Sequence, residues 1–273
     1  MKYLNLGCGA YYSVNTEWTN LDFVSSDKHV IAHNLLKGIP FESNTFDFVY
    51  HSHVLEHFSK DDGENFIKEC HRVLKPGAAI RIAIPDLERL AKDYLKTLEA
   101  GIQDPHNELL RANYNWMVLE MYDQTMRNYR AGEIGKYLHQ DQVINETFVY
   151  ERVGEEGRAF RNEFLASKKT TSKATQAGFL QKLKQAVKSF IFSLFNINPK
   201  ANEIGEFRLN GEIHQWMYDR YSLSYLLEKT GFEQVVIRDA FTSYVSNWAD
   251  YNIDGKNGIT RKPDSLFIEA KKK

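Results

Sequence analysis

Short apolar runs and helical patterns alternate along the first hundred residues of this chain. The apolar runs predict strands at residues 3–6, 18–21, 29–32, 46–50 and 78–84. Apolar positions at helical spacing predict one helix between residues 61 and 74 and another after residue 86. Strands that alternate with helices imply a parallel sheet with right-handed crossovers, so the sequence predicts an α/β fold.

This alternation stops between residues 101 and 206. The stretch is rich in Tyr, Asn, Arg and Lys, and its irregular patterning predicts helices near 109–126 and 155–165. Residues 167–178 are mostly small and polar, with three lysines, and predict a flexible linker.

The α/β pattern resumes in the last quarter of the chain. It predicts a helix at 221–229 and strands at 232–239 and 264–270. We therefore expect one domain built from residues 1–100 and 207–273, interrupted by a largely helical insertion at 101–206.

Composition narrows the class of protein. At 273 residues with 42% apolar content, the chain can build one large core. The charges of its 35 Lys and Arg nearly cancel those of its 36 Asp and Glu, so the net charge does not attract nucleic acid or an anionic membrane. Two cysteines, Cys8 and Cys70, give no disulfide framework and suit a reducing compartment. With no secretion signal or spanning apolar run, we expect a cytoplasmic protein, at most peripheral to a membrane.

The candidate chemistry begins at the first strand, which ends in Gly7-Cys8-Gly9. Glycines let a backbone turn sharply and approach a bound nucleotide closely. A second apolar run ends in Asp22, 13 residues after Gly9, where a carboxylate can accept both ribose hydroxyls. With Asn34 and His51, these residues fall at the carboxyl ends of strands, where parallel sheets bind ligands.

Five short motifs make the chain resemble the class I S-adenosylmethionine-dependent methyltransferases. It is most similar to their type 11 branch and to predicted methyltransferases of surface-polysaccharide biosynthesis. The motifs are Asn5-Leu6-Gly7-Cys8-Gly9, Asn20-Leu21-Asp22, Phe46-Asp47-Phe48-Val49-Tyr50, His53-Val54-Leu55-Glu56-His57 and Val73-Leu74-Lys75-Pro76-Gly77-Ala78. The resemblance implies a Rossmann-like sheet of seven strands with the last one antiparallel, and S-adenosylmethionine as cofactor.

The resemblance also implies roles for single residues. Gly7 and Gly9 would approach the methionine part of the cofactor, and Asp22 would hold the ribose. Asn34 would face the adenine amino group, and the main chain near His51 would flank the methionine and the acceptor.

The cofactor loop departs from the family pattern. Asn5 stands where many relatives carry an acid, and the loop lacks a third glycine. We therefore expect the insertion at 101–206 to cover the cofactor, and its Tyr, Arg and His residues to shape an acceptor pocket.

Other cofactor classes fit less well. A dinucleotide dehydrogenase would show Gly-x-Gly-x-x-Gly with an acid about 20 residues on, and no P-loop motif is present in the sequence. We expect methyl transfer to a small-molecule or glycan acceptor, at oxygen, in polysaccharide or related biosynthesis, and no nucleic-acid partner. The alternatives are a methyltransferase for another small metabolite and a non-catalytic cofactor-binding partner subunit.

Histidines are the candidate bases for a hydroxyl acceptor, since their pKa suits proton transfer. The sequence offers His51 and His214 and does not choose between them. The spacing of His51, His53 and His57, with Glu56, also suits a divalent metal. Because the resemblance brings no metal requirement, we expect none, and a structural or cofactor-flanking role instead.

Residues 178–195 form an amphipathic pattern. Seven apolar side chains share one helical face, and lysines and glutamines occupy the other. Such a helix suits either a membrane interface or a lid or subunit contact, and we favour the lid or contact.

Overall fold

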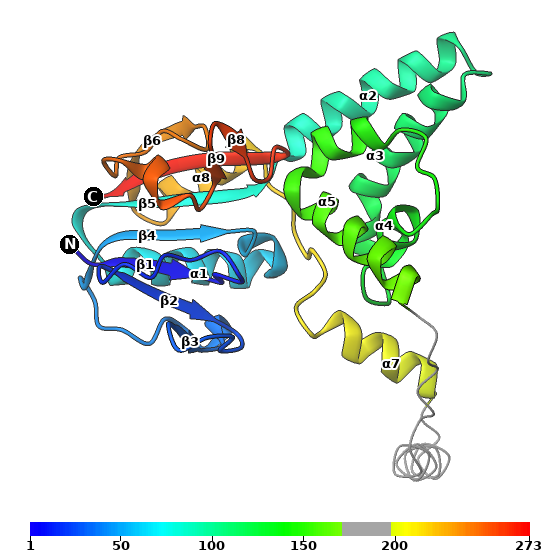
Figure 1. Cartoon of the computed structure of the whole chain (residues 1–273). Coiled ribbons are helices and arrows are strands. Elements are labelled where there is room, and N and C mark those ends of the chain that lie inside the picture. Colours follow the sequence, from blue (N-terminus) through cyan, green and yellow to red (C-terminus); the bar gives the residue numbers. More distant parts are fainter. Residues whose placement is uncertain (171–197) are drawn as a thin grey trace.

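A computed structural model of the chain describes residues 1–170 and 198–273 (Figure 1). Its centre is a mixed sheet of seven strands in the order β3-β2-β1-β4-β5-β9-β6. The strands are β1 Tyr3–Leu6, β2 Trp18–Asp22, β3 Val30–Ala32, β4 Phe46–Ser52, β5 Leu74–Pro85, β6 Phe232–Arg238 and β9 Ser265–Lys272. The first five are parallel, and β9 runs antiparallel to both β5 and β6. This confirms the expected seven-stranded sheet with its last strand antiparallel.

Helices lie against the sheet and beyond its edge. The α-helices are α1 Lys60–Val73, α2 Leu87–Gln103, α3 Glu108–Met126, α4 Gly132–Leu138, α5 Glu146–Thr170, α7 Pro199–Arg208 and α8 Arg220–Lys229. Short 3₁₀ turns are η1 Leu35–Lys37, η2 Leu55–His57 and η3 Trp248–Tyr251, and a small hairpin joins β7 Gly255–Lys256 to β8 Ile259–Thr260. No helix in the part of the chain that the structure describes has the length and apolarity to cross a membrane.

One face of the sheet packs against α1 and α8. Helix α1 begins after Ser59, whose hydroxyl accepts a hydrogen bond from the Asp62 amide, and it buries Phe66, Ile67 and Cys70 on the strands. These are apolar positions at helical spacing, as the sequence predicts.

The opposite face is covered by residues 239–262 instead of a helix. Trp248 and Ile253 pack there on a second aromatic cluster. Arg81, fully buried on β5, fixes this cover through Asp254 at 2.7 Å and through the Thr242 carbonyl at 2.8 Å, and it also pairs with Glu269 of β9 at 3.2 Å.

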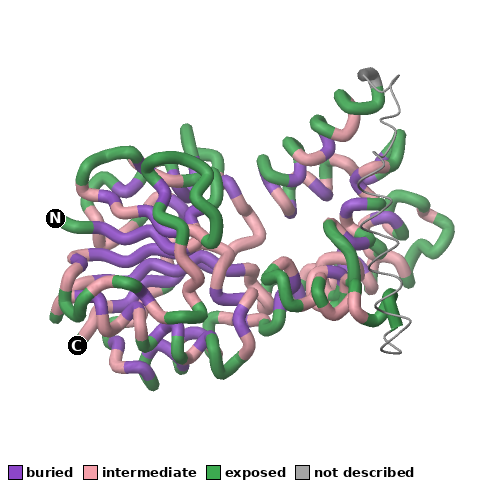
Figure 2. Tube along the Cα trace, turned by 90° about the horizontal axis from the view of Figure 1, so that it is seen from below, coloured by how far each residue is buried: buried purple, intermediate pink, exposed green. Residues whose placement is uncertain are grey.

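The helical part lies beyond the end of the sheet to which the arrows of β4 and β5 point (Figure 1). Helix α2 packs on α3, and fully buried Trp116 and Met117 centre a separate core. Figure 2 shows buried positions along the strands and a second set in this helical part.

Among its described residues, the insertion contains the two helices that its pattern predicts and two, α4 and α7, that it does not. Helix α3 matches the expected segment at 109–126, and Gly154, with φ of 63°, breaks α5 just before the expected helix at 155–165. The sequence missed α4, which has only seven residues and two glycines. Helix α5 continues to Thr170, so the predicted linker at 167–178 begins as helix. The rest of that linker and the whole of the amphipathic segment at 178–195 lie outside the described residues.

Candidate functional site

The cofactor turn follows β1 at the carboxyl edge of the sheet. Gly7 and Gly9 both adopt left-handed backbone angles, with φ of 63° and 53°. A Cβ on Gly7 would lie 2.4 Å from Cγ2 of Val54, so this glycine is required by packing. A Cβ on Gly9 would meet no atom within 4 Å, so the turn borders open space there. A ligand can therefore approach the backbone at Gly9.

Asp22 is joined directly to this turn. Its Oδ2 accepts a hydrogen bond from the Gly9 amide at 2.7 Å, while Oδ1 lies 3.5 Å from the Val24 amide. The carboxylate thus fixes the turn and keeps accepting capacity for a hydroxyl group. This arrangement fits the ribose-binding role that the resemblance implies.

Asn34 and Asn5 have structural hydrogen bonds. Oδ1 of Asn34 caps η1 by accepting from the Leu36 amide at 3.0 Å. Asn5 is buried, and its side chain donates to the Tyr11 carbonyl at 3.2 Å. Asn5 therefore supports the loop after Gly9 from beneath.

His51 lies inside the core. Its ring is fully buried edge-on against Phe66, with centroids 5.1 Å apart, and neither ring nitrogen has a hydrogen-bond partner among the described residues. Burial lowers the pKa of His51 to about 3, so the imidazole is neutral.

The other candidate base, His214, lies in a cluster with Glu56 and His57. The rings of His57 and His214 meet edge to face at 4.8 Å, and the polar atoms of the three side chains lie within 4.8 Å of one another. Burial raises the pKa of Glu56 to about 8 and lowers the pKa of both histidines. The structure thus brings His214 next to Glu56 and His57, although these residues are far apart in the sequence and belong to no common motif.

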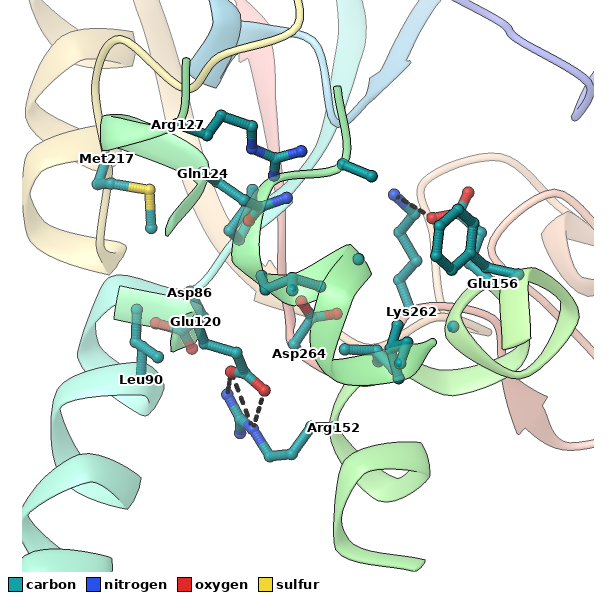
Figure 3. Close-up of a pocket in the computed structure, with 18 residues that line it drawn as sticks. Asp86, Leu90, Glu120, Gln124, Arg127, Arg152, Glu156, Met217, Lys262 and Asp264 are labelled. Atoms are coloured by element: carbon teal, nitrogen blue, oxygen red, sulfur yellow. Dashed lines mark hydrogen bonds and ion pairs between the residues drawn. The ribbon is translucent and has the colours of Figure 1, made fainter. Parts of the chain in front are cut away.

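A cavity of about 370 Å³ lies between the helical part and the sheet edge (Figure 3). Its wall combines apolar side chains with carboxylates and cations. The polar members are Asp86, Glu120, Gln124, Arg127, Arg152, Glu156, Lys262 and Asp264.

The cations of this wall already have counter-ions. Arg152 pairs with Glu120 at 2.6 Å, and Lys262 pairs with Glu156 at 2.7 Å. Asp264 differs: among the described residues its carboxylate has no salt bridge, and its hydrogen bond comes from its own backbone. Burial, reinforced by the charge of Glu120, raises the pKa of Asp264 to about 6. In Figure 3 this carboxylate is drawn between Glu120 and Lys262.

The cavity and the cofactor turn share one edge of the sheet. Asp86 follows β5, and Asp264 precedes antiparallel β9, so both lie at the edge where β1 ends in Gly7. Only β4 separates β1 from β5, and two strand spacings amount to roughly 10 Å. The cavity therefore lies beyond the same sheet edge as the glycine turn.

Sequence reasoning missed the carboxylates of the cavity. The insertion was expected to supply Tyr, Arg and His, but Asp264 belongs to the resumed α/β pattern, and Glu120 lies on α3. The rule that ligands bind at strand ends could have found Asp86 and Asp264, since both border predicted strands. Nothing in the sequence points to Glu120.

Comparison with known families gives one match. Residues 3–82 match a family model described as a methyltransferase domain, which includes the glycine turn, Asp22 and the histidine motif. No curated protein matches the chain at a significant level.

Several solved structures resemble the chain at low identity. A SAM-dependent methyltransferase from Thermotoga maritima, described as a possible histamine N-methyltransferase, aligns over 100% of this chain and 82% of its own, with 12% identity and a TM-score of 0.40. A SAM dependent methyltransferase from Archaeoglobus fulgidus aligns over 99% of this chain and 86% of its own, with 15% identity and a TM-score of 0.37. A chain from the complex between the Haloferax volcanii Trm112 methyltransferase activator and a putative methyltransferase aligns over 33% of this chain, with 16% identity and a TM-score of 0.28. This chain covers 47% of that one, about half its length.

Proposed function

We propose that this chain is a class I S-adenosylmethionine-dependent methyltransferase, which transfers a methyl group to an acceptor held in the cavity between its sheet and its helical part. The observation that carries the proposal is the shared edge. The open space at Gly9 and the cavity beside Asp264 both lie at the carboxyl end of the parallel strands. Donor and acceptor can then be aligned for direct transfer.

The residues around the turn fit the cofactor. Gly9 leaves room for a ligand to come close to its backbone, and Asp22 keeps a carboxylate oxygen for a ribose hydroxyl. When bound, S-adenosylmethionine supplies an electrophilic methyl group on its sulfonium.

For a hydroxyl acceptor, we assign proton removal to Asp264. As the acceptor oxygen bonds to the methyl carbon and the carbon–sulfur bond breaks, the hydroxyl proton passes to the carboxylate. Asp264 lines the cavity, whereas neither His51 nor His214 is among its lining residues. A carboxylate whose pKa is near 6 is ionised at neutral pH and accepts the proton more readily than an ordinary one.

We propose further that the acceptor is a hydroxyl-rich small molecule or glycan, methylated at oxygen, as in polysaccharide or related biosynthesis. The support is chemical: the polar wall of carboxylates, Arg127, Arg152 and Gln124 offers both acceptors and donors to hydroxyl groups. We place the reaction in the cytoplasm, where the buried free thiols of Cys8 and Cys70 persist.

Two measurements test the proposal. Calorimetry with S-adenosylmethionine should give micromolar binding, and a panel of sugars and nucleotide sugars with labelled donor should reveal one that is methylated. Asp264→Asn should abolish transfer while leaving donor affinity unchanged, and exposed Glu99→Gln serves as the matched control. Lack of donor binding by the folded protein would overturn the proposal.

The alternative is a non-catalytic partner subunit that binds the cofactor. It predicts donor binding without transfer to any panel member. It also predicts that Asp264→Asn has no effect on the activity of a reconstituted complex, which separates the two functions.

A further inference from the structure

We infer that Glu56, His57 and His214 form a binding site for a divalent transition-metal ion of the Zn²⁺ class. One carboxylate and two imidazoles are a ligand set that this ion favours, with a fourth position left open. This site is separate from the acceptor cavity, whose lining includes none of the three residues.

Two polar atoms of this cluster are buried without a partner among the described residues. They are Oε2 of Glu56 and Nδ1 of His214, whereas Oε1 of Glu56 lies 3.1 Å from Nδ1 of His53. Buried polar atoms are almost always paired, because an unpaired one loses its hydrogen bonds to water without replacement. An ion that accepts the lone pairs of these two atoms, together with that of His57 nearby, would satisfy them.

The segment that carries His214 is fixed against η2. The amide of Gln215 donates to the Glu56 carbonyl at 2.7 Å, and its side chain donates to the His57 carbonyl at 2.8 Å. The His214 amide is held in turn by the Gln124 carbonyl at 2.9 Å. These contacts hold the three candidate ligands together before any ion binds.

The outer contacts of the cluster are those of metal ligands. Nδ1 of His57 donates to the Ile213 carbonyl at 3.1 Å, which leaves Nε2 with a free lone pair. His53 lies behind Glu56, with Nδ1 3.1 Å from Oε1 and Nε2 bonded to Ser265 at 2.8 Å. Metal-binding imidazoles and carboxylates are commonly oriented by such second contacts.

The distances suit an ion after a small adjustment. Ligand atoms of a tetrahedral Zn²⁺ site lie roughly 3.4 Å apart, given metal–ligand bonds of about 2.1 Å. The three groups here lie within 4.8 Å of one another, so the ligand atoms must move together by up to about 1.4 Å to hold an ion.

Two cations near the cluster do not oppose an ion there, because each is neutralised locally. Arg127 pairs with Asp123 at 3.4 Å and with Glu212 at 3.2 Å. Lys262 pairs with Glu156 at 2.7 Å.

Metal titration of the chelator-treated full-length protein tests the site. Calorimetry with Zn²⁺ should show one saturable site per chain, and Co²⁺ should give the intense visible bands of a tetrahedral complex. Glu56→Gln and His214→Asn should each weaken Zn²⁺ binding by 100-fold or more, and His53→Asn by 10–100-fold. Exposed His106→Asn is the matched control and should bind as the unmodified protein does.

Two results would overturn the inference: no saturable Zn²⁺ binding by the folded protein, or unchanged binding in the ligand variants. Should those variants fail to fold, the Co²⁺ spectrum of the unmodified protein decides, and absence of tetrahedral bands refutes the site. Donor binding is measured in parallel. A failure of the metal site with intact donor affinity is therefore distinguishable from a failure of the methyltransferase function.

Discussion

The two glycines of the cofactor turn should respond differently to the same substitution. Gly7→Ala and Gly9→Ala both force alanine into a left-handed conformation, which costs about 1–2 kcal/mol. At Gly7 the new methyl group also meets Val54 Cγ2 at 2.4 Å, and overpacking adds about 1–3 kcal/mol. We expect Gly7→Ala to destabilise the fold by about 2–5 kcal/mol and Gly9→Ala by only about 1–2 kcal/mol.

Urea unfolding of both variants measures this difference. The pair Gly7→Ala and Val54→Ala forms a double-mutant cycle, because removal of the Val54 methyl groups makes room for the new one. The coupling free energy between the two substitutions should equal the cost of overpacking at Gly7→Ala, about 1–3 kcal/mol. Calorimetry should show the opposite order for the donor: Gly9→Ala should weaken S-adenosylmethionine binding tenfold or more, since its methyl group enters the open space. Equal destabilisation of the two variants, or no coupling to Val54, would refute the reasoning.

Three further predictions concern buried or ligand-facing charges. Asp22→Ala should weaken S-adenosylmethionine binding by about 1.5–3 kcal/mol in calorimetry, the value of a hydrogen bond to a charged group, and unchanged affinity would remove the ribose assignment. Arg81→Met should lower the free energy of unfolding, measured in urea, by about 3–5 kcal/mol, because Asp254 and Glu269 both lose the buried guanidinium of Arg81. The same change at exposed Lys92 is the control and should have little effect. Asp264→Asn should stabilise the protein above pH 6 and not below pH 4. The fold raises the pKa of Asp264 from 3.8 to about 6, so the folded state holds the proton more tightly and stability falls as pH rises through that window. The gain in the free energy of unfolding should be about 1–3 kcal/mol, because water in the cavity weakens the effect of burial on the Asp264 carboxylate. A variant that is equally stabilised at pH 3 and pH 7 would contradict the raised pKa of Asp264.

The sheet could be predicted because its signals are local. Apolar runs, the glycine turn and the helical stripe of α1 are each contained within about 15 residues, whereas the seven strands with an antiparallel last one were implied by the family resemblance. Helix α4 could not be predicted, because a seven-residue helix with two glycines has no periodic pattern of useful length.

The site was predictable only in part, because it joins distant segments. Gly9 and Asp22 sit at strand ends, where the rule for parallel sheets applies. His51 also lies at a strand end, but its side chain points into the core. Side chains alternate between the two faces of a strand, so a position near the strand end does not say which way a side chain points. The approach of His214 to Glu56 and the entry of Asp264 into the cavity depend on tertiary packing, which no local pattern encodes.

The position of β9 links the order of folding to the completion of the active site. This strand lies inside the sheet, yet its Glu269 is 188 residues from Arg81, its partner on β5. Pairings so distant in sequence form slowly, whereas the contacts of the helical part are local and form early. Asp264 directly precedes β9, so the cavity wall is finished only when that strand inserts. A chain that has not closed its sheet therefore has no complete cavity, so the proposed methyl transfer requires β9 to be in place.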